Sequence, residues 1–254
     1  MGETTSSVKG LFWHPEEDRL RTPFRIPVTF GLILLAAQFI LAVLDGLRGV
    51  FSLPDPVFLS LVVGLVTLAV VGIGWFIDRR YVSDMGVSPD GQWTLDAIAG
   101  LGVGFAMTGA VVVVLRLLGM ATLVETHAVT DPDFVLAGGS PLTSLLYGLL
   151  FFAALGAFEE VLVRGYLLVN AAEGLRRYLP DARTAVAGAV ALTALLFGAL
   201  HAANPGGTAL SLPNLLLAGV FLGATYAVTG RLAFAIGLHI AWNFGLGSLF
   251  GLPV

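Results

Sequence analysis

Two acids and an arginine lie inside a long apolar stretch of this sequence. Glu159, Glu160 and Arg164 follow one another within hydrophobic residues that begin near Pro141. A charge at the centre of a membrane helix costs about 2.5–3.5 kcal/mol on insertion scales, and such residues usually have a function. In a helix, Glu160 and Arg164 share a face, whereas Glu159 points about 100° away. We therefore assign Glu160 and Arg164 to a structural ion pair and leave Glu159 free to act as a general base.

Three further polar side chains lie in the same C-terminal half. His201 ends one apolar stretch, and His239 and Asn243 lie one helical turn apart in another. A single histidine or asparagine in a membrane helix is often only a contact between helices. Together with Glu159, however, the set suits hydrolysis of an acyl bond. Glu159 and His201 can activate a water molecule, and His239 and Asn243 can polarise a carbonyl or stabilise its oxyanion.

The same side chains also allow a metal site. Glu159, His201 and His239 could bind Zn²⁺ and leave one position open for water. The His-Glu-x-x-His motif of many zinc proteases is absent from the sequence. These residue types permit zinc without requiring it, so a zinc-dependent and a metal-free mechanism both stay open.

Composition indicates which scaffold must position these residues. The chain has 254 residues, of which 57% are hydrophobic and 12% charged, and its mean hydropathy is +0.90. Soluble chains carry about twice that share of charge. The apolar runs are continuous rather than alternating, which excludes a membrane β-barrel and predicts an all-α, polytopic transmembrane helical bundle. No basic patch is present that would favour nucleic acid as a partner.

The hydrophobic runs predict about seven membrane spans, at residues 24–44, 57–77, 95–118, 142–169, 184–201, 212–229 and 232–250. We expect residues 1–23 to form a polar cytoplasmic N-terminal tail. Residues 24–254 then form a single transmembrane domain.

The loop cations predict the orientation of the chain. Cations before the first span, after the second and fourth spans and after the sixth all fall on one side, and only Arg48 lies in a loop on the other. Because cytoplasmic loops carry the excess of Lys and Arg, we place the N-terminus in the cytoplasm. The chain is then an integral protein of the cell (plasma) membrane.

The predicted spans place His201 too far from Glu159 and His239 along the membrane normal for the three to form one site. Counted along the predicted spans, Glu159 and His239 lie near mid-membrane, whereas His201 lies near the outer end of its span. The offset is about eight residues, or roughly 12 Å along a helix axis. We therefore expect the helix that ends at His201 to be short, tilted or shifted inward.

Three motifs follow one another on successive predicted spans: Glu159-Glu160-x-x-x-Arg164, Phe197-x-x-x-His201 and His239-x-x-x-Asn243. In this order they resemble the CPBP family of CAAX proteases and bacteriocin-processing enzymes, also called Abi proteins. The resemblance covers residues 142–250, which would be the catalytic core. One departure is Val163, where many members have Phe, and we expect that position to serve packing.

The resemblance implies an intramembrane endopeptidase, either a metalloprotease or a glutamate-type enzyme. It assigns water activation to Glu159 and His201, and oxyanion stabilisation or metal ligation to His239 and Asn243. The implied substrates are membrane-associated proteins or peptides, such as prenylated CAAX-type proteins and leader or anchor peptides.

Two other functions are consistent with the same residues. An ion- or proton-coupled transporter could use Glu159 and the histidines as a relay. Such a transporter would often show an internal repeat, and we find none in the sequence. A non-catalytic immunity or scaffold protein could keep the motifs for stability alone, and it would tolerate loss of the Glu159 carboxylate.

Overall fold

The computed structural model describes residues 10–122, 140–202, 204 and 211–252. Apart from a short antiparallel hairpin of β1 and β2, the described elements are helical. In chain order they are β1 (Trp13–His14), β2 (Arg19–Leu20), α2 (Thr22–Phe51), α3 (Asp55–Asp78), the 3₁₀ turn η1 (Val82–Met85), α4 (Gly91–Leu117), α5 (Pro141–Glu160), the π-helical segment η2 (Val161–Leu168), α6 (Val169–Leu175), α7 (Ala182–His201), α8 (Ser211–Thr229), α9 (Ala233–Asn243) and the π-helical segment η3 (Phe244–Leu249).

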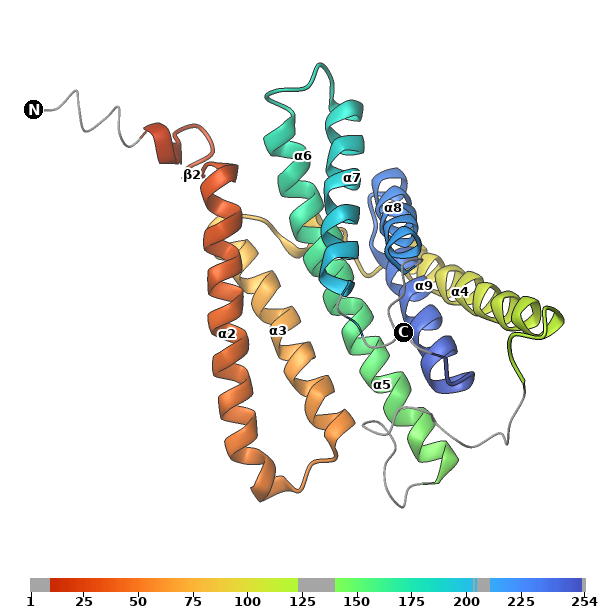
Figure 1. The fold of residues 1–254 in the computed structure, drawn as a ribbon. Helices are drawn as coiled ribbons and strands as arrows, with labels where there is room; N and C mark the ends of the chain where they lie inside the picture. Colours follow the sequence, from red (N-terminus) through yellow and green to blue (C-terminus); the bar gives the residue numbers. More distant parts are fainter. Residues whose placement is uncertain (1–9, 123–139, 203, 205–210, 253–254) are drawn as a thin grey trace, which may run out of the picture.

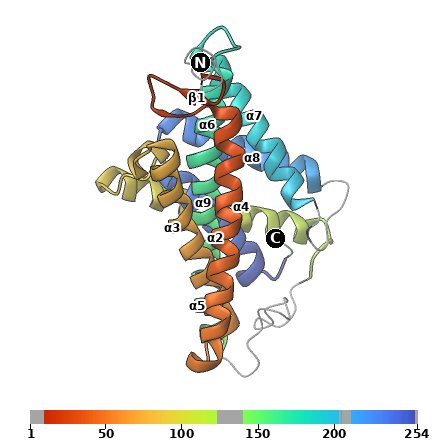
Figure 2. The ribbon, with the colours of Figure 1, turned by 90° about the vertical axis from the view of Figure 1, so that its left-hand side faces the viewer.

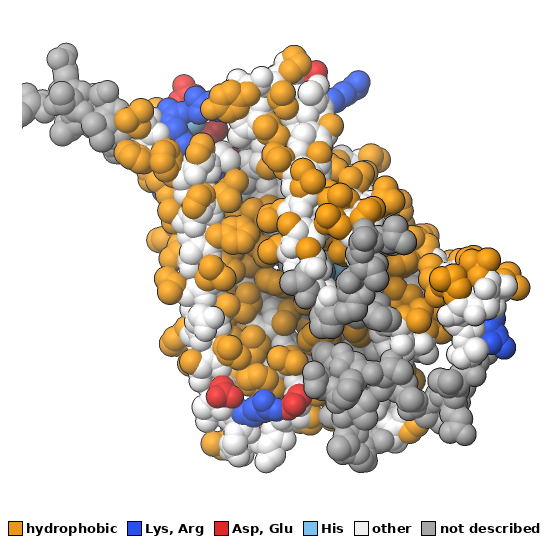
Figure 3. Space-filling view, in the orientation of Figure 1, with side chains coloured by type: hydrophobic (Ala, Val, Ile, Leu, Met, Phe, Trp, Pro, Cys, Tyr) orange, Lys and Arg blue, Asp and Glu red, His pale blue; other side chains and the backbone are white. Residues whose placement is uncertain are grey.

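The helices form the predicted polytopic bundle. Six of them are long and apolar enough to cross a membrane, and the helix of α9 and η3 is shorter. Large apolar side chains cover the outside of the bundle, and charged side chains lie toward its two ends (Figure 3). This surface is expected of helices that face lipid, because a charge is costly in the hydrocarbon core. The prediction of an all-α membrane bundle of about seven spans is therefore confirmed.

A single long helix passes through the centre of the bundle (Figure 1). It consists of α5, η2 and α6 and runs without a break from Pro141 to Leu175. α7 returns beside it and packs on η2 and α6, while α3 and α9 pack on α5. α2 lies alongside α3, and α4 is steeply inclined to both of them in the two ribbon views (Figures 1 and 2).

The length of this central helix reduces the predicted offset between Glu159 and His201. The helix ends at Leu175 rather than at residue 169, so Glu159 lies 16 residues before its end. His201 lies 19 residues after the start of α7 at Ala182. Because the two helices are antiparallel neighbours, the remaining difference is 3 residues, or about 4.5 Å along the axis.

The contact between α4 and α9 depends on glycine. A Cβ atom at Gly104 would lie 2.6 Å from the Cβ of Ala241 and 2.7 Å from the carbonyl oxygen of Leu238. A Cβ at Gly100 or Gly237 would likewise meet backbone atoms of the facing helix. Small residues at such a seam let two membrane helices approach closely. The contact between α4 and α9 also holds α9 in place, and α9 carries His239.

Replacement of Gly104 by leucine should therefore separate α4 from α9. Forcing extra atoms into a packed contact typically costs about 1–3 kcal/mol. We expect a lower thermal transition in detergent and a lower yield of folded protein. Gly102→Leu is the matched control, because Gly102 lies on the same helix and a Cβ there would meet no atom of another helix within 4 Å. If both variants lose the same stability, the α4–α9 contact is not the cause.

The described part of the predicted N-terminal tail is folded. From Trp13 onward it forms the β1–β2 hairpin, which contacts α3. Arg19 donates to the carbonyl oxygen of Asp78 at 3.0 Å and fixes the hairpin on the bundle. Part of the segment predicted as a tail, residues 1–23, is thus folded onto the transmembrane helices.

Arg25 is buried within α2 rather than exposed in a loop. Its Nε lies 2.8 Å from Asp78 Oδ1, and its Nη2 lies 2.7 Å from Glu173 Oε2. The side chain of Asn170 also accepts a hydrogen bond from Arg25 and donates one to Asp78 at 3.2 Å. Burying these charges is tolerated because each has a partner of opposite sign. The network ties α2, α3 and α6 together at one end of the bundle.

Candidate active site

The predicted site residues come from three helices that pack together. Glu159 and Glu160 end α5, His201 ends α7, and His239 lies in α9. α9 approaches α5 closely at Gly156, where a Cβ would be 3.0 Å from Ile240 Cγ1. The absence of a side chain at Gly156 thus helps to place His239 opposite the two acids.

The expected ion pair between Glu160 and Arg164 is present. Arg164 Nη1 lies 2.8 Å from Glu160 Oε1, and both side chains are fully buried. The guanidinium also donates to the Gly219 carbonyl at 3.4 Å and lies over the ring of Phe197, with Cζ 4.7 Å from the centroid. Because Arg164 contacts α5, α7 and α8, it joins three helices as well as balancing one acid.

Glu160 has a second partner that the sequence did not reveal. His239 Nδ1 lies 2.7 Å from the same Oε1 atom that binds Arg164. A carboxylate that holds a ring nitrogen fixes both the tautomer and the orientation of the imidazole. Glu160 is therefore a positioning residue for His239 as well as a partner for Arg164.

The Glu159 carboxylate faces both histidines. Its Oε2 atom lies 3.6 Å from His201 Nε2 and 3.5 Å from His239 Nε2. The same oxygen is buried and has no hydrogen-bond partner among the residues that the structure describes. The structure thus brings Glu159, His201 and His239 together, as the sequence motifs predicted, and leaves an unsatisfied acceptor at their centre.

The other ring nitrogen of each histidine determines what faces Glu159. His201 Nδ1 lies 2.8 Å from the Phe197 carbonyl oxygen, which can only accept a hydrogen bond. His239 Nδ1 is held by the Glu160 carboxylate. In the neutral form, both imidazoles therefore carry their proton on Nδ1, an assignment made from the partners. Each Nε2 then presents a lone pair to Glu159 Oε2.

Glu159 Oε2 and the two Nε2 atoms would be three acceptors close together, which is unfavourable unless a donor hydrogen lies between them. A water molecule between them can donate to two acceptors, and a protonated imidazole can donate to the carboxylate. The cluster holds two acids but only the one arginine, Arg164, so a single additional proton would make it neutral. Neutrality is favoured because isolated charge is costly inside a membrane. The arrangement is suited to holding a water molecule and moving one proton.

Phe197 shapes the site in a way that the motif spacing alone did not explain. Its ring is buried, with its centroid 4.3 Å from that of His201 and 6.0 Å from that of His239. The guanidinium of Arg164 also packs over this ring. Phe197 therefore contacts both the imidazoles and the arginine that balances Glu160. The position was visible in the sequence as the first residue of the Phe-x-x-x-His motif.

Asn243 lies one turn after His239 in α9 and is half-buried. Two π-helical segments begin at the motifs: η2 starts directly after Glu160 and contains Arg164, and η3 starts directly after Asn243. Such wide turns are rare and often occur at functional sites. Val163, the departure from the family pattern, is buried within η2, as a packing residue would be.

The zinc prediction gains no support from the side-chain arrangement. Within residues 10–122, 140–202, 204 and 211–252, no group of three or more His, Cys, Asp or Glu side chains is placed to hold a metal ion. Glu159 is near both histidines, but three ligands must surround one point. Zn²⁺ binding by Glu159, His201 and His239 stays a prediction.

The fold and the site together define a helical integral membrane protein with a buried acid–imidazole centre. Residues 141–245 match the family model of type II CAAX prenyl endopeptidase Rce1-like proteins. This segment contains all three motifs, so the family resemblance predicted from them is confirmed. The match indicates a hydrolase, specifically a membrane protease. Searches of curated proteins and of solved structures gave no match.

Proposed function

We propose that this protein is an intramembrane endopeptidase in which Glu159 and His201 activate a water molecule. The observation that supports this mechanism best is the convergence of Glu159 Oε2 with the Nε2 atoms of His201 and His239 at 3.6 and 3.5 Å. With the one additional proton on His239, Glu159 Oε2 and His201 Nε2 are the two acceptors, so a water molecule donates to both of them and directs its oxygen lone pair outward.

In the reaction, the water oxygen attacks the carbonyl carbon of the scissile peptide bond. Glu159 accepts the proton that water loses, assisted by His201. The carbonyl oxygen becomes an oxyanion, which a protonated His239 and the Asn243 amide stabilise. The C–N bond then breaks, and the proton held by Glu159 passes to the leaving amine. The products are a carboxylic acid and an amine, and the carboxylate of Glu159 is restored.

Glu160 and Arg164 support this chemistry without contacting the substrate. Glu160 holds the Nδ1 proton of His239, so Nε2 is the atom that faces the reaction. Protonation of Nε2 then gives an imidazolium that Glu160 stabilises. Arg164 lies 2.8 Å from Glu160 and donates a charge-assisted hydrogen bond to the same carboxylate.

We propose prenylated CAAX-type proteins as the first substrate class to test, with leader or anchor peptides as the second. The protein would be reconstituted in lipid nanodiscs and incubated with fluorogenic peptides of three kinds: a prenylated CAAX peptide, the same peptide without the prenyl group, and a leader peptide. We expect cleavage of the prenylated peptide. Cleavage of the leader peptide alone would move the substrate to the second class.

Two further measurements test whether the reaction needs a metal and whether the protein has an alternative function. Metal analysis of the purified protein, followed by assay after treatment with a chelator, separates a zinc-dependent from a metal-free mechanism. If none of the peptides is cleaved, but proteoliposomes show ion or proton flux, the peptidase proposal is wrong and a transporter is indicated.

A further inference from the structure

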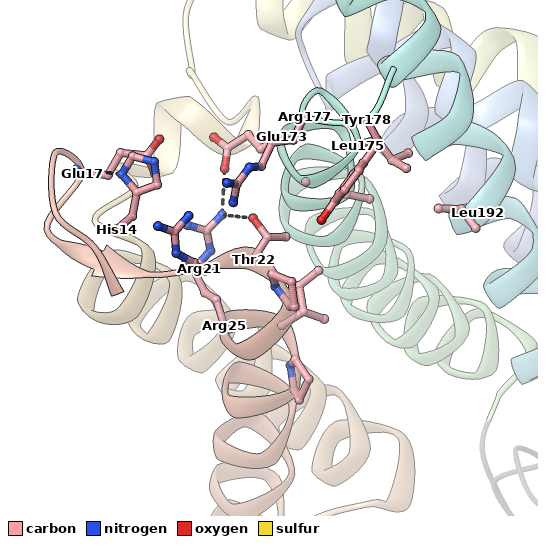
Figure 4. Close-up of a pocket in the computed structure, with 15 residues that line it drawn as sticks. His14, Glu17, Arg21, Thr22, Arg25, Glu173, Leu175, Arg177, Tyr178 and Leu192 are labelled. Atoms are coloured by element: carbon pink, nitrogen blue, oxygen red, sulfur yellow. Dashed lines mark hydrogen bonds and ion pairs between the residues drawn. The ribbon is translucent and has the colours of Figure 1, made fainter. Parts of the chain in front are cut away.

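A cavity apart from the Glu159 site lies at the end of the bundle that carries the N-terminal hairpin (Figure 4). Its volume is about 510 Å³, which is within the range of ligand sites. The hairpin, the start of α2, α6 with the turn after it, and α7 line it. None of the Glu159-centred site residues contributes to its lining.

The two acids that line this cavity are already paired. Glu17 Oε2 lies 2.8 Å from the Nε of Arg19. Glu173 binds Arg25 at 2.7 Å and also forms an ion pair with Arg80. These carboxylates are therefore neutralised by neighbouring arginines and do not oppose an incoming anion.

Two arginines of the lining have no such partner. Within the described residues, neither Arg21 nor Arg177 forms an ion pair with a carboxylate. Arg21 Nε donates to the Gly10 carbonyl at 2.9 Å, and no other hydrogen bond of this side chain is found within the described residues. His14 Nδ1 accepts from the backbone of Glu17, so in the neutral ring its Nε2 is a donor. Within the described residues, the polar part of the cavity thus offers two guanidinium groups without a carboxylate partner and an imidazole N–H.

The remaining part of the lining is apolar and continues onto the lipid-facing surface. Ile26 and Pro27 of α2 and Leu175 of α6 form it, together with Leu192 of α7, whose exposed fraction is 51%. α2 and α7 both begin at this end of the bundle and run into the apolar band. The cavity therefore has cations where the helices begin and apolar side chains where they enter the membrane.

We propose that this cavity binds the phosphate headgroup of an anionic phospholipid. The guanidinium groups of Arg21 and Arg177 bind the phosphate oxygens, since arginine is well suited to charge-assisted hydrogen bonds with phosphate. The first part of an acyl chain lies along Ile26 and Leu192. A soluble phosphate compound shares the charged group but would leave this apolar part uncovered.

The test is lipid retention measured by native mass spectrometry on protein from nanodiscs. Nanodiscs of phosphatidylcholine alone would be compared with nanodiscs that contain phosphatidylglycerol. We expect one phosphatidylglycerol to be retained by the unchanged protein. Arg21→Gln combined with Arg177→Gln should weaken its binding about 25-fold, because one arginine near an anionic headgroup contributes about a fivefold effect.

Arg183→Gln is the matched control, because Arg183 is exposed just after the start of α7 and does not line the cavity. Arg177→Gln alone covers the case in which the double variant does not fold, because Arg177 is exposed. Equal weakening by Arg183→Gln would show only a general surface effect and overturn the proposal. Displacement of the lipid by inorganic phosphate at millimolar concentration would assign the site to a soluble anion instead.

Discussion

A Glu159→Gln variant is expected to lose peptidase turnover while keeping its fold. Glutamine has the shape of glutamate but cannot accept the proton of the attacking water, so kcat should fall about 10²–10⁴-fold. Within the described part of the chain Glu159 Oε2 has no hydrogen-bond partner, so we expect the change to glutamine to leave the fold intact. Turnover would be measured with the cleaved fluorogenic peptide, and stability by thermal unfolding in the same nanodiscs.

The control is Glu16→Gln, the same chemical change at an exposed residue of the hairpin. It should leave both turnover and the unfolding temperature unchanged. Should Glu159→Gln keep more than about a tenth of the turnover, Glu159 is not the general base, since removing such a base costs at least about 100-fold. The scaffold function would be favoured if the variant also kept full activity in cells.

The sequence predicts this fold well because each helix is marked by composition. The hydrophobic run beginning near residue 212 corresponds to α8, which starts at Ser211 and ends at Thr229. The central helix was underestimated because Glu173 and Asn170 look like the end of a span when they are taken alone. In the structure, Arg25 and Arg80 neutralise Glu173, so the helix continues to Leu175.

The sequence predicts the members of the site but not their contacts. Helical spacing placed Glu160 beside Arg164, because residues i and i+4 share a face. It could not place Glu160 beside His239, since the two are 79 positions apart and meet only when α9 packs on α5. The ion pair of Arg25 with Asp78 was not predictable for the same reason, because Asp78 lies on another helix.

An Arg164→Ala variant is expected to lose folded protein rather than turnover. The substitution leaves Glu160 fully buried without its guanidinium partner. Removal of one member of a buried ion pair typically costs about 3–5 kcal/mol. Phe197 would also lose its contact with the arginine, and the Gly219 carbonyl would lose a donor. We expect a large fall in the yield of folded protein, measured by size-exclusion chromatography of detergent extracts.

The double variant Glu160→Leu with Arg164→Met separates stability from catalysis. Replacing both members of a buried pair by apolar residues is often neutral or stabilising, so the yield should recover. Turnover should not recover, because His239 Nδ1 loses the carboxylate 2.7 Å away that fixes its tautomer. Recovery of both properties would mean that Glu160 serves only to balance Arg164. Recovery of the yield alone would assign Glu160 two separate tasks, holding the helices through Arg164 and orienting the imidazole that faces Glu159.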